Sequence, residues 1–323
     1  MSCREKNRIR QAAGSALFLA GLILLLSFTS YLVLPKNNLE AFGMTDVTAN
    51  GILGEPDDSI DVLVLGDSEA FCHISPMEMW QRQGFTSYVC GTSSQYLYWS
   101  DTFLRQAFQN QKPKVVILET NAIYRDLSRK DTLVNRLENW FPVFRYHNRW
   151  KSIRSGGFLS PVEYTWTDDY KGFAYNNTVD PAVSTDHMTP TEEVASIQPL
   201  NQWMVHSMAR FCQENGAVFL LVSTPSTLNW NYAKHNGVQQ LADTLGVSYI
   251  DMNLMTQEIP IDWSTDTRDK GDHLNYAGAV KVSSWLGQYL QEQYQLPDHR
   301  QDEAYARWNQ ALERYRNGVG ASS

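Results

Sequence analysis

The sequence predicts an α/β fold: a three-layer α/β/α sandwich with a five-stranded, mostly parallel, flavodoxin-like sheet, preceded by one N-terminal transmembrane helix. Short apolar runs rich in Val, Leu and Ile alternate with segments whose apolar residues recur at helical spacing. Strands that alternate with helices favour right-handed crossovers and a parallel sheet covered on both faces. An uncharged stretch, 12–34, precedes this pattern and is long enough to cross a bilayer as a helix.

Each strand is predicted from a short apolar run bounded by polar or turn residues, which is typical of a strand buried in a parallel sheet. The five expected strands are 60–66, 87–90, 114–119, 217–224 and 247–251.

Each helix is predicted from the spacing of its apolar residues and from signals at its ends. Ser75 is the expected N-cap of the first helix, with Pro76 at its first position and Glu78 at its third. Gly84 ends that helix, as Gly246 ends a later one. The expected helices are 76–84, 96–110, 192–215, 235–245 and 275–290.

The stretch 12–34 is predicted to be an uncleaved membrane anchor. Four basic residues precede it, namely Arg4, Lys6, Arg8 and Arg10. The positive-inside rule then places residues 1–11 in the cytoplasm and everything after Leu34 outside, as a single-pass protein of the cell membrane. A cleaved signal peptide is the alternative, but its apolar region should be shorter and followed by a small-x-small site, whereas this one runs into Pro35.

The remaining chain is divided by composition into a linker, a domain and a tail. Residues 35–59 are rich in Asn, Gly, Pro and Asp and are expected to be a linker. The extracytoplasmic domain spans 60–296 and contains an aromatic-rich insertion at 122–195, expected to form short helices and loops. The tail, 297–323, is expected to form one amphipathic helix that packs on the domain or docks a partner or the membrane. Its apolar face carries Tyr305, Trp308, Leu312 and Tyr315.

Composition excludes some classes of function. The net charge of −8 argues against a nucleic-acid-binding protein, which usually has a basic face. The seven His residues have no metal-ligand spacing, and no Gly-rich phosphate loop is present, so we expect no metal and no cofactor. Aromatic residues make up 12% of the chain, which favours surfaces that hold carbohydrate rings, although an aromatic core would use the same residues.

Three cysteines lie outside the membrane on this topology, where a disulfide is chemically permitted. Cys72 follows the first strand and Cys90 ends the second, so a bridge between them is one interpretation. The other is that Cys72, Cys90 and Cys212 are small buried apolar residues.

Polar residues follow the strands at positions that converge if the sheet is parallel. Ser68 follows the first strand, Gly91 the second, Asn121 the third, and the pair Asp272 and His273 the fifth. The carboxyl ends of parallel strands lie at one edge of the sheet, where open α/β folds place their sites.

These residue types suit nucleophilic catalysis. Ser68 is the expected nucleophile, with His273 as the base that deprotonates it. Asp272 or Asp269 would orient the imidazole and stabilise its cation, and Asp272 is the first choice because Gly271 permits the turn that it needs.

An oxyanion would be held by the backbone N–H groups of Ser68 and Gly91 and by the side-chain amide of Asn121. Each residue alone has a plainer interpretation. Gly-Asp-Ser is a common turn, Asn121 a common turn former, and His273 an ordinary loop residue.

The four blocks resemble those of the SGNH (GDSL-like) hydrolase superfamily. The matching segments are Gly66-Asp67-Ser68, Gly91, Asn121 and Asp272-His273-Leu274-Asn275. The resemblance implies a serine nucleophile at Ser68, oxyanion donors at Gly91 and Asn121, and a base at His273. Two departures are visible. The third block reads Glu119-Thr120-Asn121-Ala122 where the superfamily has Gly-x-Asn-Asp, and Lys270 stands where its acid lies.

A finer resemblance is to the membrane-anchored DltD-type group of Gram-positive bacteria. It rests on the segments Gly66-Asp67-Ser68-Glu69-Ala70-Phe71, Ile74-Ser75-Pro76-Met77-Glu78, Tyr88-Val89-Cys90-Gly91-Thr92 and Glu119-Thr120-Asn121. The resemblance implies a role in D-alanylation of teichoic acid, or partnership with a membrane-bound O-acyltransferase that decorates surface polymers.

Three hypotheses of function follow. The first is an extracytoplasmic enzyme that transfers acyl groups on teichoic acid or surface polysaccharide through an acyl-Ser68 intermediate. The second is a free-standing carbohydrate esterase or deacetylase that uses the same site. The third is a non-catalytic scaffold for polymer or for a membrane-bound O-acyltransferase.

Overall fold

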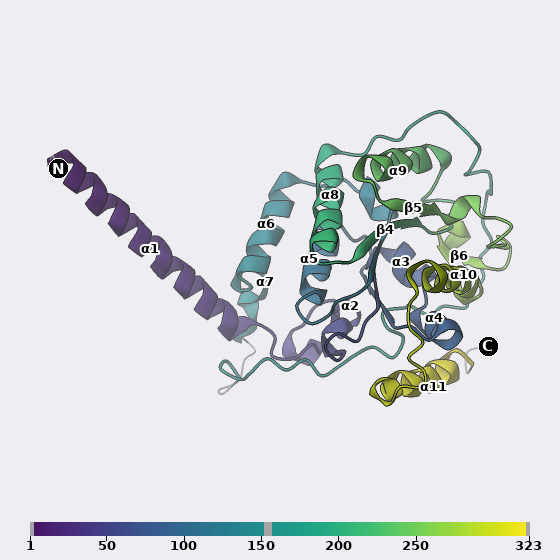
Figure 1. Cartoon of the computed structure of the whole chain (residues 1–323), viewed down its shortest axis with the longest axis horizontal. Helices are drawn as coiled ribbons and strands as arrows, with labels where there is room; N and C mark the ends of the chain where they lie inside the picture. The colour runs from purple at the N-terminus through teal and green to yellow at the C-terminus, as the bar shows by residue number, and fades with distance from the viewer. Residues whose placement is uncertain (1–2, 152–156, 321–323) are drawn as a thin grey trace. The chain divides into compact units, whose positions relative to one another are not determined.

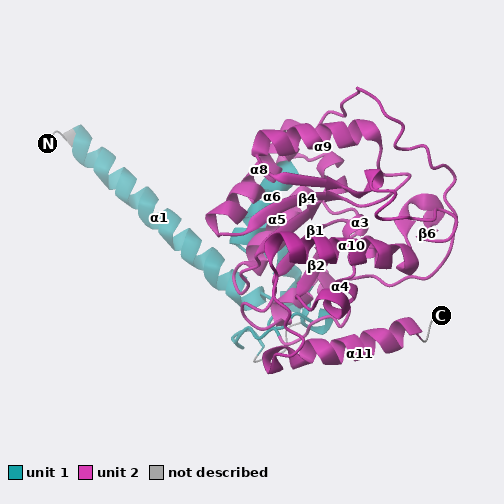
Figure 2. Cartoon of the chain, turned by 45° about the vertical axis from the view of Figure 1, so that its right-hand side comes forward, with its two compact units in different colours: residues 1–44, 130–164 teal, residues 45–129, 165–323 magenta. Residues whose placement is uncertain are grey.

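The computed structural model describes residues 3–151 and 157–320, which form two compact units (Figures 1 and 2). The first unit comprises residues 1–44 and 130–164, and the second comprises residues 45–129 and 165–323. The second unit contains the sheet and every predicted site residue.

The sheet of the second unit confirms the predicted fold class. Its strands are β1 (Val62–Gly66), β2 (Ser87–Gly91), β3 (Val115–Glu119), β4 (Val218–Ser223) and β5 (Ser248–Asp251). All pair in parallel, in the order β2-β1-β3-β4-β5, which is the flavodoxin-like order.

Helices cover both faces of this sheet (Figure 1). Successive strand residues point to opposite faces, and both faces of these strands are apolar, so each face needs a layer of helices. Leu63 and Leu65 of β1 pack in one apolar cluster with α5 (Leu97–Ala107), α8 (Pro199–Glu214) and α9 (Tyr232–Leu245). Val62 and Val64 pack in the other cluster, with α3 (Ser68–His73), α4 (Pro76–Gln83) and α10 (Tyr276–Tyr294).

The cap signals of α4 are confirmed. The Ser75 hydroxyl accepts a hydrogen bond from the backbone N–H of Glu78, and Gly84 ends the helix at φ +83°. This conformation suits glycine because a Cβ would crowd the backbone.

Two helices differ from the prediction. Helix α3 was not predicted, because six residues are too few to show a helical period. Helix α8 begins at Pro199 and not at 192, because the preceding segment is extended and hydrogen-bonded to α9. There Ala195 donates its N–H to the carbonyl of Ala233 at 2.8 Å, and the Asn236 amide donates to the carbonyl of Thr191 at 2.8 Å.

The predicted linker, 35–59, differs in its second half, which packs into the second unit as α2 (Val47–Asn50) and the 3-10 turn η2 (Gly51–Gly54). The hydroxyl of Tyr88 donates to the carbonyl of Thr48 at 2.8 Å. A Cβ on Gly54 would lie 1.9 Å from the carbonyl oxygen of Trp166, so glycine here permits close packing and does not mark a flexible linker. The first half contains the 3-10 turn η1 (Glu40–Phe42) of the first unit.

The proposed Cys72–Cys90 bridge is wrong: Cys72, Cys90 and Cys212 are all free and buried. The two thiols have different partners. The Cys72 sulfur accepts a hydrogen bond from Nη2 of Arg268 at 2.8 Å, whereas Cys90 donates to the carbonyl of Ala49 at 3.4 Å. Burial raises the pKa of the Cys72 thiol to about 12, so it is a weak nucleophile.

The tail forms the 3-10 turn η7 (Glu303–Tyr305) and helix α11 (Ala306–Gly320), which packs on α4. The ring of Trp308 lies 5.2 Å from that of Trp80, measured between centroids, and both side chains are fully buried. The Tyr315 hydroxyl lies 3.2 Å from Oε1 of Glu78. Packing on the domain is therefore a structural role of this helix.

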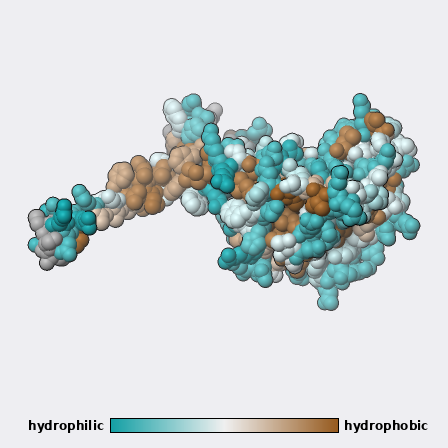
Figure 3. Space-filling view, turned by 90° about the horizontal axis from the view of Figure 1, so that it is seen from above, coloured by the Kyte–Doolittle hydropathy of each residue, from teal (hydrophilic) through white to brown (hydrophobic). Residues whose placement is uncertain are grey.

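The first unit contains the long helix α1 (Cys3–Val33) and part of the insertion. That part forms α6 (Arg129–Trp140), α7 (Val143–Tyr146) and the 3-10 turn η4 (His147–Lys151). The side chains of α1 are largely exposed and apolar, as the brown band in Figure 3 shows. A membrane anchor and a signal sequence both fit such a helix.

The rest of the insertion belongs to the second unit. It begins with the 3-10 turn η3 (Asn121–Tyr124), and residues 165–195 are irregular. Its backbone is hydrogen-bonded to the domain, since Val89 donates to the carbonyl of Lys171 at 2.9 Å and Ala174 donates to that of Phe71 at 2.8 Å.

The contact between α11 and α4 predicts a large loss of stability on truncation of its central ring. Trp308→Ala should lower the free energy of unfolding by about 3–5 kcal/mol, because it opens a cavity against Trp80. Gln310→Ala, at an exposed position of the same helix, should change it by less than about 0.5 kcal/mol. Urea unfolding of the two variants measures the difference, and equal effects would show that α11 is not part of the core.

Candidate active site

The carboxyl ends of β1 and β2 bring Ser68 and Gly91 to the same edge of the sheet. Gly66, the last residue of β1, is in register with Gly91, the last residue of β2. Oδ1 of Asp67 caps α3 by accepting the N–H of Glu69 at 3.1 Å, which leaves Ser68 as the first, partly exposed residue of that helix. A Cβ on Gly91 would lie 3.3 Å from the carbonyl oxygen of Asp67, so the backbone approaches closely here.

Asn121 is held at this edge by Asp67. Its side-chain Nδ2 donates to Oδ2 of Asp67 at 3.0 Å, and Nη2 of Arg125 lies 3.1 Å from the same oxygen. An amide nitrogen has two hydrogens, so the second N–H of Asn121 remains for a substrate oxygen. The three predicted oxyanion donors are thus close together, and their role stays a prediction.

His273 lies in a small antiparallel pair of strands, β6 (Thr267–Arg268) and β7 (His273–Leu274). The intervening turn, η6 (Asp269–Gly271), has three consecutive residues at positive φ: +55°, +61° and +95°. Left-handed backbone at two non-glycine residues costs free energy and is typical of functional sites. This turn brings the carboxylate of Asp269 within hydrogen-bond distance of the His273 imidazole.

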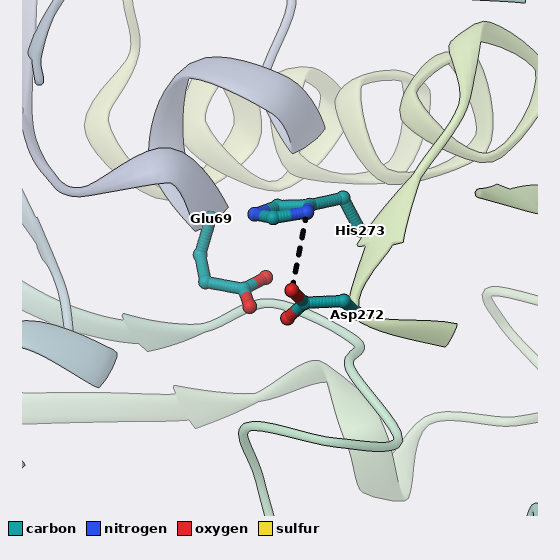
Figure 4. Close-up of side chains that lie close together, drawn as sticks. All are labelled: Glu69, Asp272 and His273. Atoms are coloured by element: carbon teal, nitrogen blue, oxygen red, sulfur yellow. Dashed lines mark ion pairs between the residues drawn. The ribbon is translucent and has the colours of Figure 1, made fainter. Parts of the chain in front are cut away.

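Asp269 and Asp272 both approach His273. Nδ1 of the imidazole is 3.1 Å from Oδ2 of Asp269. It is 3.6 Å from Oδ2 of Asp272, the contact that Figure 4 shows as a dashed line. The other oxygen of Asp272 accepts a hydrogen bond from the amide of Asn229. The sequence favoured Asp272 over Asp269, whereas hydrogen-bond distance favours Asp269 as the partner of His273.

The opposite nitrogen, Nε2 of His273, is buried and has no hydrogen-bond partner among the described residues. Strand β7 packs against α3, the helix that Ser68 begins. Nε2 is the atom that a general base uses once Nδ1 is engaged by a carboxylate. No hydrogen bond joins it to Ser68 within residues 3–151 and 157–320 of this substrate-free structure, and such bonds commonly tighten only when substrate binds.

His73 is hydrogen-bonded to the backbone next to His273, a contact that the sequence did not suggest. Its Nε2 accepts the backbone N–H of Leu274 at 2.9 Å, and its Nδ1 is hydrogen-bonded to Oγ1 of Thr224 at 2.8 Å and lies 3.0 Å from Oε2 of Glu69. These bonds require a neutral imidazole that carries its proton on Nδ1. The rings of His73 and His273 are 6.0 Å apart, edge to face. The available signal was the i, i+4 spacing of Glu69 and His73.

Buried carboxylates lie under the site. Burial, and then the neighbouring charges of Glu119 and Asp67, raise the pKa of Glu69 well above its usual value. Burial likewise raises the pKa of Glu119, whose Oε2 accepts the N–H of Asn121 at 3.0 Å. Asn229 joins this group to the histidine loop, because its amide donates to Oε1 of Glu69 at 2.6 Å and to Asp272. Asn229 follows β4, a strand end to which the sequence assigned no role.

Donor atoms of Glu69, Asp272 and His273 lie within 4.8 Å of one another, which is close enough for a shared cation. The amide of Asn229 donates to both carboxylates, however, and a positively polarised N–H next to both ligands opposes cation binding. We therefore assign no metal role to this group.

The state of His73 predicts a dependence of stability on pH. Burial, together with the charges of His273 and Arg268, lowers the pKa of His73 well below 6.5. Between pH 6.5 and 5.5 the unfolded chain takes up a proton at this position and the folded chain does not, so the free energy of unfolding falls as pH falls. The loss should be about 1 kcal/mol greater for the wild type than for His73→Gln.

Urea unfolding of both proteins at pH 6.5 and 5.5 measures this difference, and the other histidines cancel in the comparison. Equal losses in the two proteins would mean that His73 is protonated in the folded state.

Comparison of the sequence with protein-family models and with curated proteins finds no match. Several solved structures resemble the fold at low identity. The lipase/acylhydrolase from Enterococcus faecalis is 10% identical, with a TM-score of 0.41 over 74% of this chain and 98% of that one. A GDSL-like lipase from Bacteroides thetaiotaomicron is 12% identical, with a TM-score of 0.35 over 72% and 87%. A variant of the acetyl-xylooligosaccharide esterase Axe2 from a Geobacillus is 12% identical, with a TM-score of 0.38 over 73% and 94%.

Proposed function

We propose that this chain is a membrane-anchored, extracytoplasmic serine enzyme of the SGNH type that transfers or removes acyl groups on cell-envelope polymers. The observation that carries the proposal is the state of His273. One ring nitrogen is engaged by Asp269, and the other is buried and unpartnered at the sheet edge that Ser68 occupies. An imidazole so held is prepared to accept a proton from a serine hydroxyl.

The reaction proceeds in two halves. Nε2 of His273 accepts the proton of Ser68 as Oγ attacks the ester carbonyl, and the oxyanion is held by N–H groups of Ser68, Gly91 and Asn121. The imidazolium then gives its proton to the departing alkoxide, which leaves acyl-Ser68. In the second half, His273 takes the proton of an acceptor hydroxyl, of polymer or of water, as that oxygen attacks the carbonyl of acyl-Ser68. The tetrahedral intermediate then collapses: its bond to Oγ of Ser68 breaks, the His273 imidazolium returns the proton to Oγ, and the new ester or acid leaves.

Helix α1 supports a location outside the cytoplasmic membrane for the catalytic domain. Its exposed apolar surface and the basic residues ahead of it, Arg4, Lys6, Arg8 and Arg10, support an anchor whose cytoplasmic end is the N-terminus. The enzyme would then act on teichoic acid or surface polysaccharide, and a membrane-bound O-acyltransferase is the partner that could supply its acyl groups.

The first test asks whether Ser68 and His273 are needed to form the acyl-enzyme. Ser68→Ala and His273→Ala should each lower acyl-enzyme formation by about 10³-fold or more, because the nucleophile or its base is removed. Mass spectrometry of the full chain after exposure to a fluorophosphonate, or to an acyl donor, locates the label. Ser248→Ala, at an exposed position of β5, is the matched control.

Labelling that persists in Ser68→Ala would reject the nucleophile. Unchanged ester content on the surface polymer of cells that carry this variant would favour a non-catalytic scaffold, and rapid turnover of acyl-Ser68 to water would favour a free-standing esterase.

The second test compares Asp269 and Asp272 as the acid that supports His273. Asp269→Asn should lower kcat about 10- to 100-fold, since it removes the charge that orients Nδ1 of His273 and stabilises the imidazolium. The effect is kept modest by the solvent exposure of Asp269, whose side chain is 55% exposed. Asp272→Asn should have a smaller effect. Steady-state rates on one ester compare the two variants, and the opposite order would make Asp272 the acid.

A further inference from the structure

A cavity of about 670 Å³ lies beside the candidate active site, within the range of ligand pockets. Two of its lining residues connect it to Ser68. Gly91 is a predicted oxyanion donor, and Phe71 belongs to α3, the helix that begins at Ser68. A group bound in this cavity would therefore lie next to the predicted position of the reacting ester.

Aromatic side chains form one part of the lining: Tyr96, Tyr98 and Trp99. The rings of Tyr96 and Tyr98 are stacked, with centroids 5.4 Å apart and planes 9° from parallel, and Tyr96 is 37% exposed. One exposed ring beside two half-buried rings at a concave surface suits ligands with both apolar and polar edges, such as the faces of a sugar.

The N-terminal end of α5, which carries these rings, is held in place by hydrogen bonds of the turn before it. Gln95 is buried, its Nε2 donates to Oγ of Ser100 at 2.9 Å, and its Oε1 accepts from Oγ1 of Thr92 at 3.0 Å. A prepared surface of this kind lowers the ordering cost of binding.

The rest of the lining is rich in hydroxyl groups and poor in charge. Thr48, Thr92, Ser93 and Ser94 can exchange hydrogen bonds with a polyol. Among the described residues that line the cavity, the one charged residue is Asp46, which is acidic. Phosphate recognition relies on Arg and Lys. The guanidinium of Arg125 lies 5.8 Å from the ring centroid of Tyr96, but it is paired with Asp67.

We infer that this cavity binds a neutral saccharide, so that the acceptor or donor polymer is a neutral glycan and not a phosphate-bearing chain. The inference rests on the proposed function, which leaves open whether the polymer is teichoic acid or polysaccharide. An acidic side chain and the lack of cations in the described lining disfavour a polyanion, while stacked rings and hydroxyl groups favour a pyranose.

The test measures binding without chemistry. The full chain carrying Ser68→Ala is purified in a detergent without a sugar headgroup and titrated calorimetrically with four probes. Three are neutral tetrasaccharides of glucose, mannose and N-acetylglucosamine, and the fourth is a glycerol phosphate tetramer. We expect saturable binding of at least one neutral tetrasaccharide, and weaker binding of the phosphate oligomer.

Substitutions locate the site. In the same background, Tyr96→Ala should weaken glycan binding about tenfold, and Tyr96→Phe, which keeps the ring, should restore it to within about threefold. The matched control is Tyr289→Ala, which removes one ring of another stacked pair, with Trp285 at 5.3 Å, outside the cavity. This control should leave binding unchanged.

Three results would overturn the inference: no binding of any neutral tetrasaccharide, tighter binding of the phosphate oligomer, or equal losses from Tyr96→Ala and Tyr289→Ala. Because binding is measured without Ser68, failure here leaves the serine mechanism standing. Conversely, glycan binding by a chain that forms no acyl-Ser68 would reject the proposed function and keep this site.

Discussion

The buried carboxylate of Asp67 is the contact on which the geometry of the candidate site depends. One oxygen caps α3 at Glu69, and the other holds Asn121 and Arg125. The residue is fully buried, so each oxygen needs these donors in place of water. Ser68 and Asn121 follow different strands, β1 and β3, and this single side chain sets the distance between them.

A second set of bonds sets the position of the base. The backbone N–H of Leu274 donates to His73, whose other ring nitrogen is hydrogen-bonded to Thr224 and lies 3.0 Å from Glu69, the residue after Ser68. Ser68, the predicted nucleophile, and His273, the predicted base, therefore lie on segments that meet at one buried imidazole, although about two hundred positions separate them in the sequence. Precise placement of this kind matters because small displacements of catalytic groups are costly to rate.

The sequence predicted the fold well where one physical rule dominates. Buried parallel strands must be apolar along their whole length, so runs such as Val62–Gly66 and Val115–Glu119 are distinct from helices. Helix α4 was predicted because Ser75 and Gly84 have the side chain and the backbone freedom that its two ends require. The convergence of Ser68, Gly91 and Asn121 followed from the parallel sheet alone.

The rest depended on contacts between distant segments, which leave no local pattern. Gly54 lies in a segment whose composition is typical of a linker, but glycine is needed there because the backbone of Trp166 approaches closely. The distance of Asp269 from His273 depends on left-handed backbone at Asp269 and Lys270, which neither residue type suggests. Asn229 lies in the loop after β4, and its hydrogen bond to Asp272 joins segments that are far apart in the sequence.

The packing of α11 on α4 also constrains how this protein reaches its folded state during synthesis. Trp80 and Trp308 are 228 positions apart (308 minus 80), yet each covers the other. At about 5–20 residues per second, the ribosome needs roughly tens of seconds to supply the second ring after the first. Through that interval the indole of Trp80 and the apolar face around it lack their cover. Until α11 is made, this uncovered apolar surface is a place where the unfinished chain can aggregate or bind a chaperone.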